Sequence, residues 1–356
     1  MNVLILGELL SSVHLIVSLE FVMLKKKVSV YSLLAIVFTA SLCVYFVTAY
    51  FYNQKPEDPL EKEHTNYKIT RMQGSKFIKP LVSAKPVSES GKFSDIKKSV
   101  TDIINSYKNK SLISSASVYF RDFDQSDWCV VNEYDKYMCG SLLKIPELIA
   151  FLKMEEAHPG TLDRKIAYNQ LLTSDKTQRI KSKSVVMGQV YSIKELLGYM
   201  IEYSDNNATM LLNQNLDVNV FKKVFTDLGL APVDWNAKTY YLTVKDCSIF
   251  LESLYNASYL TVPHSEFAVE LLSKSDYSDG ILKVIPNENL RVAHKFAEAG
   301  TDLDKELHET AVFYIKDNAY LLTIMTKGNS KIELPVLAKA IQEISGKVYS
   351  GLTSLN

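Results

Sequence analysis

The chain has 356 residues, of which 47% are hydrophobic and 22% charged, and its formal net charge is zero. This balance is typical of a globular protein with a full core, in one large or two modest domains. The neutral charge gives no electrostatic reason to expect a nucleic acid as a partner.

The N-terminal part carries a long apolar run. Three lysines at 25–27 precede an uncharged segment over 28–52, which is long enough to span a bilayer. Lysines next to a span stay on the cytoplasmic side, so residues after Tyr52 are expected outside the cell membrane. Residues 1–27 are a cytoplasmic or additional apolar segment, and a second membrane pass there stays open.

The composition turns polar and proline-rich after the apolar run. Residues 53–90 are predicted to be a polar tether, and 91–356 a folded domain. Within this domain the patterns predict a helix over 93–108 and a strand and hairpin partner, then helices, three further strands and a final helix. The expected ranges are 115–123 and 127–133 for the hairpin, 141–274 for the helical part, 290–297, 309–316 and 319–327 for the later strands, and 334–348 for the last helix.

Strands therefore stand at both ends of the domain and helices fill its middle. This order predicts an α/β (α+β) fold, in which an antiparallel sheet is built from both ends of the chain and a helical subdomain is inserted between them. The four cysteines form neither a CxxC pair nor a zinc pattern, so no metal or cofactor is expected. A disulfide between Cys129 and Cys139 is left open.

The stretch CGSLLKIPELIAFLKM places Ser141 and Lys144 one turn apart, where an apolar helix is expected to begin. A serine hydroxyl becomes a nucleophile when a neighbouring base takes its proton, and a lysine can be that base when it is neutral. A helix N-terminus adds positive potential that favours the neutral amine. The alternative interpretation is that Ser141 only caps the helix.

Two further motifs follow in the chain. Ser204, Asp205 and Asn206 come directly after an amphipathic helical pattern, and Lys295 lies on an expected strand near the C-terminus. Each motif alone could be a turn, a cap or an exposed lysine. His294, beside Lys295, should point to the opposite face of the strand and have a structural role.

S-x-x-K, then S-D-N about sixty residues later, then a strand lysine, resembles class A β-lactamases and penicillin-binding proteins. The resemblance covers nearly all of 115–356 and implies a five-stranded antiparallel sheet flanked by terminal helices, with an inserted all-helical subdomain. It makes Ser141 the acylated nucleophile, Lys144 its base, and Ser204 the proton relay to the leaving nitrogen. Substrate binding would fall to Asn206, Lys295 and the backbone N–H of Glu298, and Asp205 would be structural.

Two departures from the family pattern bear on turnover. The strand triplet K-[ST]-G reads Lys295-Phe296-Ala297, which removes a hydroxyl and adds a methyl group at the substrate carboxylate site. The E-x-x-L-N loop motif, whose glutamate activates the deacylating water, is absent between Leu216 and Leu242, where Asp234 is a weak substitute.

The sequence thus predicts a membrane-anchored, monomeric serine hydrolase outside the cytoplasm. It would open a β-lactam or a related amide through a Ser141 acyl-enzyme that deacylates slowly. The alternatives are a D,D-peptidase-like enzyme acting on peptidoglycan peptides, or a degenerate domain that binds cell-wall peptide without turnover.

Overall fold

A computed structural model describes residues 30–53, 67–72, 79–170, 179–180, 182–237, 239–285, 292–301, 303–316 and 318–355. The chain divides into two compact units, 1–64 and 65–356. In the first unit the described residues form one helix, α2 (Val30–Asn53). A search of the described residues identifies no helix as a candidate membrane span, so the anchor expected over 28–52 is not confirmed. The whole segment expected over 1–27, including the lysine cluster, lies outside the described residues.

The second unit is built around one five-stranded antiparallel sheet with the order β4-β3-β11-β10-β9. Its strands are β3 (Ser115–Asp122), β4 (Trp128–Val131), β9 (Val292–Gly300), β10 (Lys305–Ile315) and β11 (Asn318–Lys327). The strand from the start of the domain pairs with the last strand in the chain, as Val118 opposite Ile324 illustrates. The predicted sheet, built from both ends of the chain, is therefore confirmed.

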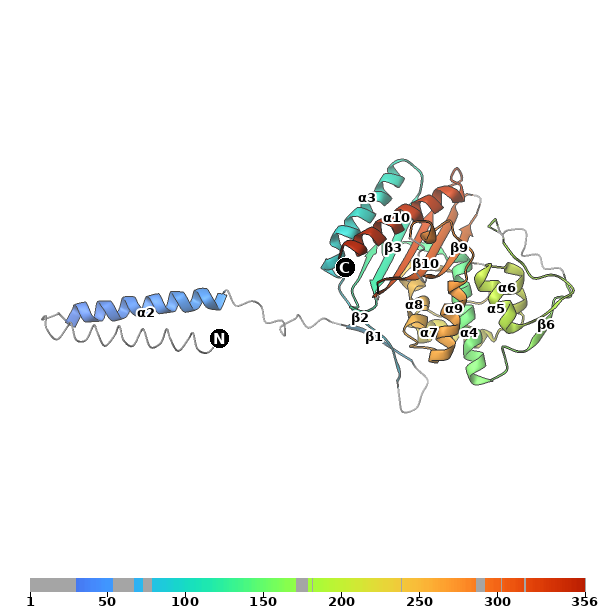
Figure 1. Cartoon of the computed structure of the whole chain (residues 1–356), viewed down its shortest axis with the longest axis horizontal. Helices are drawn as coiled ribbons and strands as arrows, with labels where there is room; N and C mark the ends of the chain where they lie inside the picture. Colours follow the sequence, from blue (N-terminus) through green and yellow to red (C-terminus); the bar gives the residue numbers. More distant parts are fainter. Residues whose placement is uncertain are drawn as a thin grey trace. The chain divides into compact units, whose positions relative to one another are not determined.

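Helices cover both faces of this sheet, so its strands are buried almost throughout (Figure 1). One face carries α3 (Ser94–Asn109) and α10 (Leu334–Leu355). The buried side of α3 presents Ile96, Val100 and Ile104, which are spaced four residues apart and so form one apolar stripe. These residues share a core with strand side chains such as Phe120 and Phe296.

The other face carries the inserted helical subdomain. Its helices are α4 (Lys144–Ala157), α5 (Ile193–Glu202), α6 (Asn206–Asn213), α7 (Val218–Asp227), α8 (Val244–Tyr255) and α9 (Val262–Ser273). α4 is the central helix of the second core, because its residues 144–152 are all buried. Two small sheets complete this subdomain: β5 (Lys136–Met138) pairs with β8 (Tyr241–Thr243), and β6 (Lys165–Ala167) with β7 (Val190–Ser192).

The remaining elements lie near the ends of the domain and in its short turns. β1 (Tyr67–Arg71) pairs with β2 (Leu81–Pro86), and Val82 joins the core of the helical subdomain. The ordered domain therefore includes residues that the sequence had assigned to the tether. Short 3-10 turns are η1 (Gly91–Phe93), η2 (Gly140–Leu143) and η4 (Ile281–Lys283). Cys129 and Cys139 are both free thiols, so the disulfide left open by the sequence is absent between them.

Candidate active site

The predicted nucleophile lies in the 3-10 turn η2, between β5 and α4. The sequence interpretation that Ser141 caps the helix is wrong. α4 begins at Lys144, its N-cap position is Leu143, and no side chain caps it. Gly140 has φ +51, a conformation that disfavours residues with a side chain. A Cβ there would overlap the carbonyl oxygen of Glu298, so the turn that carries Ser141 lies directly against strand β9.

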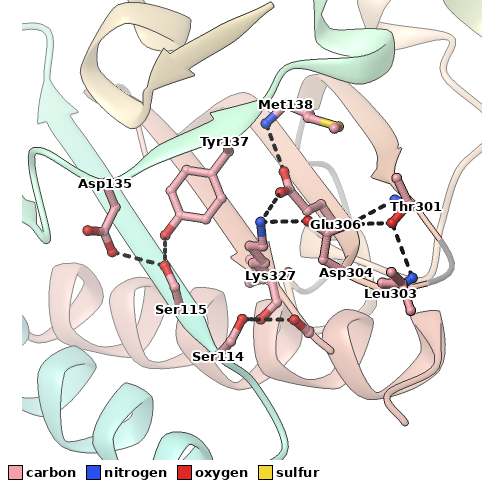
Figure 2. Close-up of polar contacts among 12 residues, drawn as sticks. Ser114, Ser115, Asp135, Tyr137, Met138, Thr301, Leu303, Asp304, Glu306 and Lys327 are labelled. Atoms are coloured by element: carbon pink, nitrogen blue, oxygen red, sulfur yellow. Dashed lines mark hydrogen bonds and ion pairs between the residues drawn. The ribbon is translucent and has the colours of Figure 1, made fainter. Parts of the chain in front are cut away.

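Strand β5, which leads into this turn, is held by buried side chains of β10. Figure 2 shows the Met138 backbone N–H donating to Glu306 Oε2 over 2.8 Å. His308 Nε2 lies 2.9 Å from the Met138 carbonyl oxygen, so both polar groups of this peptide have partners. The second Glu306 oxygen lies 3.3 Å from the Lys327 amine. The sheet thus fixes the backbone two residues before Gly140.

The Lys144 amine is buried and surrounded by acceptors from the S-D-N segment. It lies 2.6 Å from the Ser204 carbonyl oxygen, 3.2 Å from Ser204 Oγ and 2.8 Å from Asn206 Oδ1. Burial lowers the pKa of Lys144 to about 8, while the charges of Glu147, Asp205 and Glu298 act in the opposite direction. A lysine with such a pKa has a substantial neutral fraction near neutral pH, which a general base requires.

The S-D-N segment is a constrained turn at the start of α6. Ser204 has φ +53, which is unusual for a residue with a side chain and is common at functional sites. Asp205 is the N-cap of α6, since its Oδ1 accepts from the Asn207 N–H over 3.0 Å. The same carboxylate accepts from the Ser184 hydroxyl and the Val185 N–H. Asp205 therefore has the structural role expected for it, and this role places Ser204 and Asn206 at Lys144.

Lys295 lies on β9 opposite Thr310 and is fully buried. Its amine donates to the Phe296 carbonyl over 2.9 Å and lies 4.4 Å from the centre of the Phe296 ring. Burial, helped by the charge of Lys144, holds the pKa of Lys295 well below its usual value. The charge of Lys144 therefore reaches Lys295, which places the two amines in one region of the domain.

The neighbours of Lys295 on the strand face the other way. Phe296 belongs to the core beneath α3 and α10, where its ring stacks on Tyr277 with centres 4.1 Å apart. His294 Nδ1 lies 2.8 Å from Glu309 Oε1, and both side chains are buried. This buried pairing agrees with the structural role that the sequence predicted for His294.

Glu298 has a side-chain role that the sequence did not indicate. Its Oε1 accepts from the backbone N–H groups of Arg179 and Ile180 over 2.9 and 3.0 Å. Its backbone carbonyl is the group that lies against Gly140. Glu298 thus joins the segment before α5 to the strand beside the nucleophile. Only the tertiary fold brings these segments together, so no local pattern could have revealed the contact.

Glu147 is a second acidic residue that sequence reasoning missed. It is buried one turn after Lys144 on α4. Burial raises the pKa of Glu147 to about 7, against the opposing effect of Lys144 and Asn213. The spacing of Ser141, Lys144 and Glu147, each three residues apart, was a visible signal for a shared helix face.

In the 216–242 segment, which was expected to lack a deacylating base, Asp234 is the acid that the sequence offered as a weak substitute. Asp234 is exposed, and its Oδ1 accepts from the Asn236 N–H over 2.9 Å, so the carboxylate is engaged within its own turn. The Tyr240 hydroxyl donates to the Asp234 carbonyl in the same turn. No group of three or more His, Cys, Asp or Glu side chains in the described part of the chain could hold a metal ion.

A family model described as "Beta-lactamase enzyme family" matches residues 95–352, which is most of the chain. The chain belongs to this beta-lactamase enzyme family. The match begins at α3 and ends within α10, so it includes the whole sheet and the helical subdomain.

Solved structures share the fold of this beta-lactamase family member at low sequence identity. PBP-A is 16% identical with a TM-score of 0.60, and the alignment covers 73% of this chain and 97% of PBP-A. A beta-lactamase from Sphaerobacter thermophilus is 16% identical with a TM-score of 0.61, with 73% and 97% covered. A class A beta-lactamase from Mycobacterium abscessus is 17% identical with a TM-score of 0.61, with 72% and 99% covered. No curated protein matches the chain.

Proposed function

We propose that this protein is a serine hydrolase that opens a β-lactam or a related amide through an acyl-enzyme on Ser141. The observation that carries the proposal is the Lys144 amine, buried beside Ser204 and Asn206 and one turn from Ser141. In the first step Ser141 Oγ attacks the amide carbonyl carbon while Lys144 takes the hydroxyl proton. Ser204 then relays a proton to the leaving nitrogen, so the C–N bond breaks as the ester forms.

The remaining predicted residues would hold the substrate. The N–H groups of Ser141 and Glu298 would stabilise the developing oxyanion, and the approach of Gly140 to Glu298 supports this pairing. Asn206 would bind the amide side chain of the substrate. Lys295 would orient a substrate carboxylate, which requires its amine to leave the Phe296 carbonyl. A variant of PBP-A solved as an acyl-enzyme with penicillin G makes a penicillin a reasonable first probe.

Deacylation is proposed to be slow. It needs a base that activates water on the ester, and such bases contribute about 10²–10⁴-fold. The 216–242 segment contains no glutamate, and the Asp234 carboxylate is engaged in its own turn. A β-lactam that reacts should therefore stay attached to Ser141.

Labelling of the full-length protein with a fluorescent penicillin, followed by intact-protein mass spectrometry, tests this proposal. The expected result is a persistent adduct on Ser141 that is absent from Ser141→Ala, whose thermal midpoint stays nearly unchanged. Normal labelling of Ser141→Ala would contradict the assignment of the nucleophile. Rapid multiple turnover without an adduct would contradict slow deacylation.

A second candidate is a domain that binds cell-wall peptide without turnover. The observation favouring it is that Phe296 packs into the core and Lys295 binds its carbonyl, where the family pattern has a hydroxyl residue after the lysine. Binding of a peptidoglycan peptide that Ser141→Ala retains, without any acylation of the unsubstituted protein, would favour this candidate. A D,D-peptidase activity would instead release the terminal D-alanine from such a peptide.

We also propose that the protein is a monomer anchored in the cell membrane with its domain outside the cytoplasm. The support comes from the sequence, in which the lysines at 25–27 precede the uncharged run over 28–52. Protease added to intact cells should then digest the domain from Gly91 onward. Digestion only after lysis would overturn the orientation.

A further inference from the structure

Glu147 is a buried acid close to the proposed catalytic groups, and the steps described above do not use it. It follows Lys144 by three residues on α4, so the two side chains share one face of the helix. The Glu147 residue is 7% exposed and Lys144 is 4% exposed. Two opposite charges on one helix face, both removed from water, interact far more strongly than a surface pair does.

The contacts of Glu147 do not account for its burial as a structural carboxylate. The side chain of Asn213, the last residue of α6, lowers the pKa of Glu147, while Glu147 Oε2 has no hydrogen-bond partner among the described residues. Asn213 Oδ1 also has none, so two buried acceptors are left without a donor. An unpaired buried carboxylate oxygen is costly. The cation whose charge acts on Glu147 and lowers this cost, within the described chain, is Lys144.

Glu147 differs from the other acidic groups that act on Lys144, because those groups accept several hydrogen bonds of their own. The acidic groups that act on Lys144 are Glu147 from α4, Asp205 from the start of α6 and Glu298 from β9, and Glu147 has the largest effect of the three. Asp205 already accepts three hydrogen bonds, and Glu298 accepts two from Arg179 and Ile180. The charge of Lys144 lowers the pKa of Lys295 on β9, and the charge of Glu147 raises the pKa of the Tyr240 hydroxyl.

We propose that Glu147 is the counter-ion of Lys144 and a positioning residue for it, which keeps the buried amine basic enough to accept the Ser141 proton. This inference rests on the proposed acyl-enzyme chemistry. Burial alone would make Lys144 a weak base. When the amine takes the serine proton it becomes an ammonium, and the Glu147 carboxylate stabilises that charge as it forms. The proton moves from oxygen to nitrogen, and Glu147 itself forms no bond to the substrate.

The proposed effect of Glu147 on the pKa of Lys144 has a definite direction, which a substitution can test. A carboxylate near an amine raises its pKa, so Glu147→Gln should lower the pKa of Lys144, by about one to two units for a buried pair one turn apart. The acid side of the pH profile for acylation should move down by the same amount. The rate on the plateau should fall several-fold, because a less basic amine accepts a proton less readily. Glu147→Asp, which keeps the charge, should restore part of both effects.

The experiment measures the titration of Lys144 by ¹³C NMR of full-length protein labelled at the lysine ε-carbons, with the signal assigned by its loss in Lys144→Arg. The same variants are then acylated with a penicillin from pH 5 to 10. Glu266→Gln, an exposed acid on α9, is the matched control and should change neither curve. Circular dichroism confirms that each variant is folded.

The NMR titration decides the inference even if no penicillin reacts. A lower pKa of Lys144 in folded Glu147→Gln supports the counter-ion role, and an unchanged titration overturns it. Loss of acylation in Glu147→Gln with an unchanged Lys144 titration also overturns it, because Glu147 would then act directly. Failure of the unsubstituted protein to react with penicillin would count against the proposed function alone.

Discussion

The backbone of Gly140 packs directly against the carbonyl of Glu298, so the turn carrying Ser141 and the edge strand β9 approach without a side chain between them. This contact places the N–H groups of Ser141 and Glu298 on neighbouring segments. It also explains why the position before the serine is a glycine, because both its positive φ and the close approach exclude a Cβ.

Gly140→Ala should therefore damage both the fold and the chemistry. Overpacking of this kind costs about 1–3 kcal/mol, and the shifted turn should slow penicillin labelling more than tenfold. Gly160→Ala is the matched control, since Gly160 has φ +93 but no atom within 4 Å of its Cβ position. Chemical denaturation and labelling rates measure the two variants. Equal effects would mean that backbone strain, and not the contact with Glu298, makes Gly140 necessary.

The Glu306 carboxylate should prove necessary for placing the nucleophile. Glu306→Ala removes a buried carboxylate that accepts from the partly buried Met138 N–H and pairs with the half-buried Lys327. Leaving a buried donor unpaired costs about 1–3 kcal/mol, and labelling should slow because β5 leads into the turn of Ser141. Glu333→Ala removes an exposed partner of Lys305, and such pairs contribute about 0–1 kcal/mol. A normal labelling rate in folded Glu306→Ala would show that β5 needs no such support.

The stability of the domain should depend on pH through Glu147. Its pKa is about 7 in the folded protein and 4.5 for an unperturbed glutamate, so the folded state binds more protons between these values. Stability from this group is complete below pH 4.5 and is lost as the pH rises through 7. Relative to the unsubstituted protein, Glu147→Gln should therefore gain stability as the pH rises from 4.5 to 7, because glutamine has no proton to lose. Thermal midpoints at the two pH values measure this, and parallel curves would contradict the buried, titrating acid.

Phe296→Thr should not restore the hydroxyl of the family triplet to the site. Phe296 is buried in the core beneath α3 and α10, where its ring stacks on Tyr277 and lies 4.4 Å from the Lys295 amine. Truncating a buried phenylalanine costs about 3–5 kcal/mol, and the ring of Tyr277 would lose its stacking partner. Denaturation and labelling should show a destabilised protein that reacts no faster. Faster labelling would mean that this position does reach the substrate.

Much of the fold followed from patterns that are local in the chain. The alternation over 115–123 and the strand-like run over 319–327 located β3 and β11, and the helical pattern over 93–108 located α3. The start of α4 was misplaced, because the 3-10 turn before it depends on packing against β9. The ordered pair β1 and β2 was missed because its proline-rich, charged sequence resembles a linker.

The residues of the candidate site also separate into those that a local sequence pattern reveals and those that only the fold brings together. Ser141, Lys144, Ser204 and Asn206 could be named because their motifs are contiguous, and the fold brings Lys144 to the last two. The carboxylates of Glu298 and Glu306 could not, because their partners lie more than one hundred residues away in the chain. The roles in catalysis stay predictions until the variants are measured.

The burial of Phe296 also bears on how this sequence could change over generations. A lineage that began to select for rapid destruction of an antibiotic could not simply regain the usual strand triplet, because the first substitution would open a hole beside Tyr277. The core under α10 would have to be refilled before a hydroxyl at this strand could be tolerated. Selection usually removes single substitutions that lower the free energy of unfolding by several kcal/mol. The packing of Phe296 on Tyr277 therefore works against a return to the usual triplet. Improvements in turnover should arise at other positions in the site.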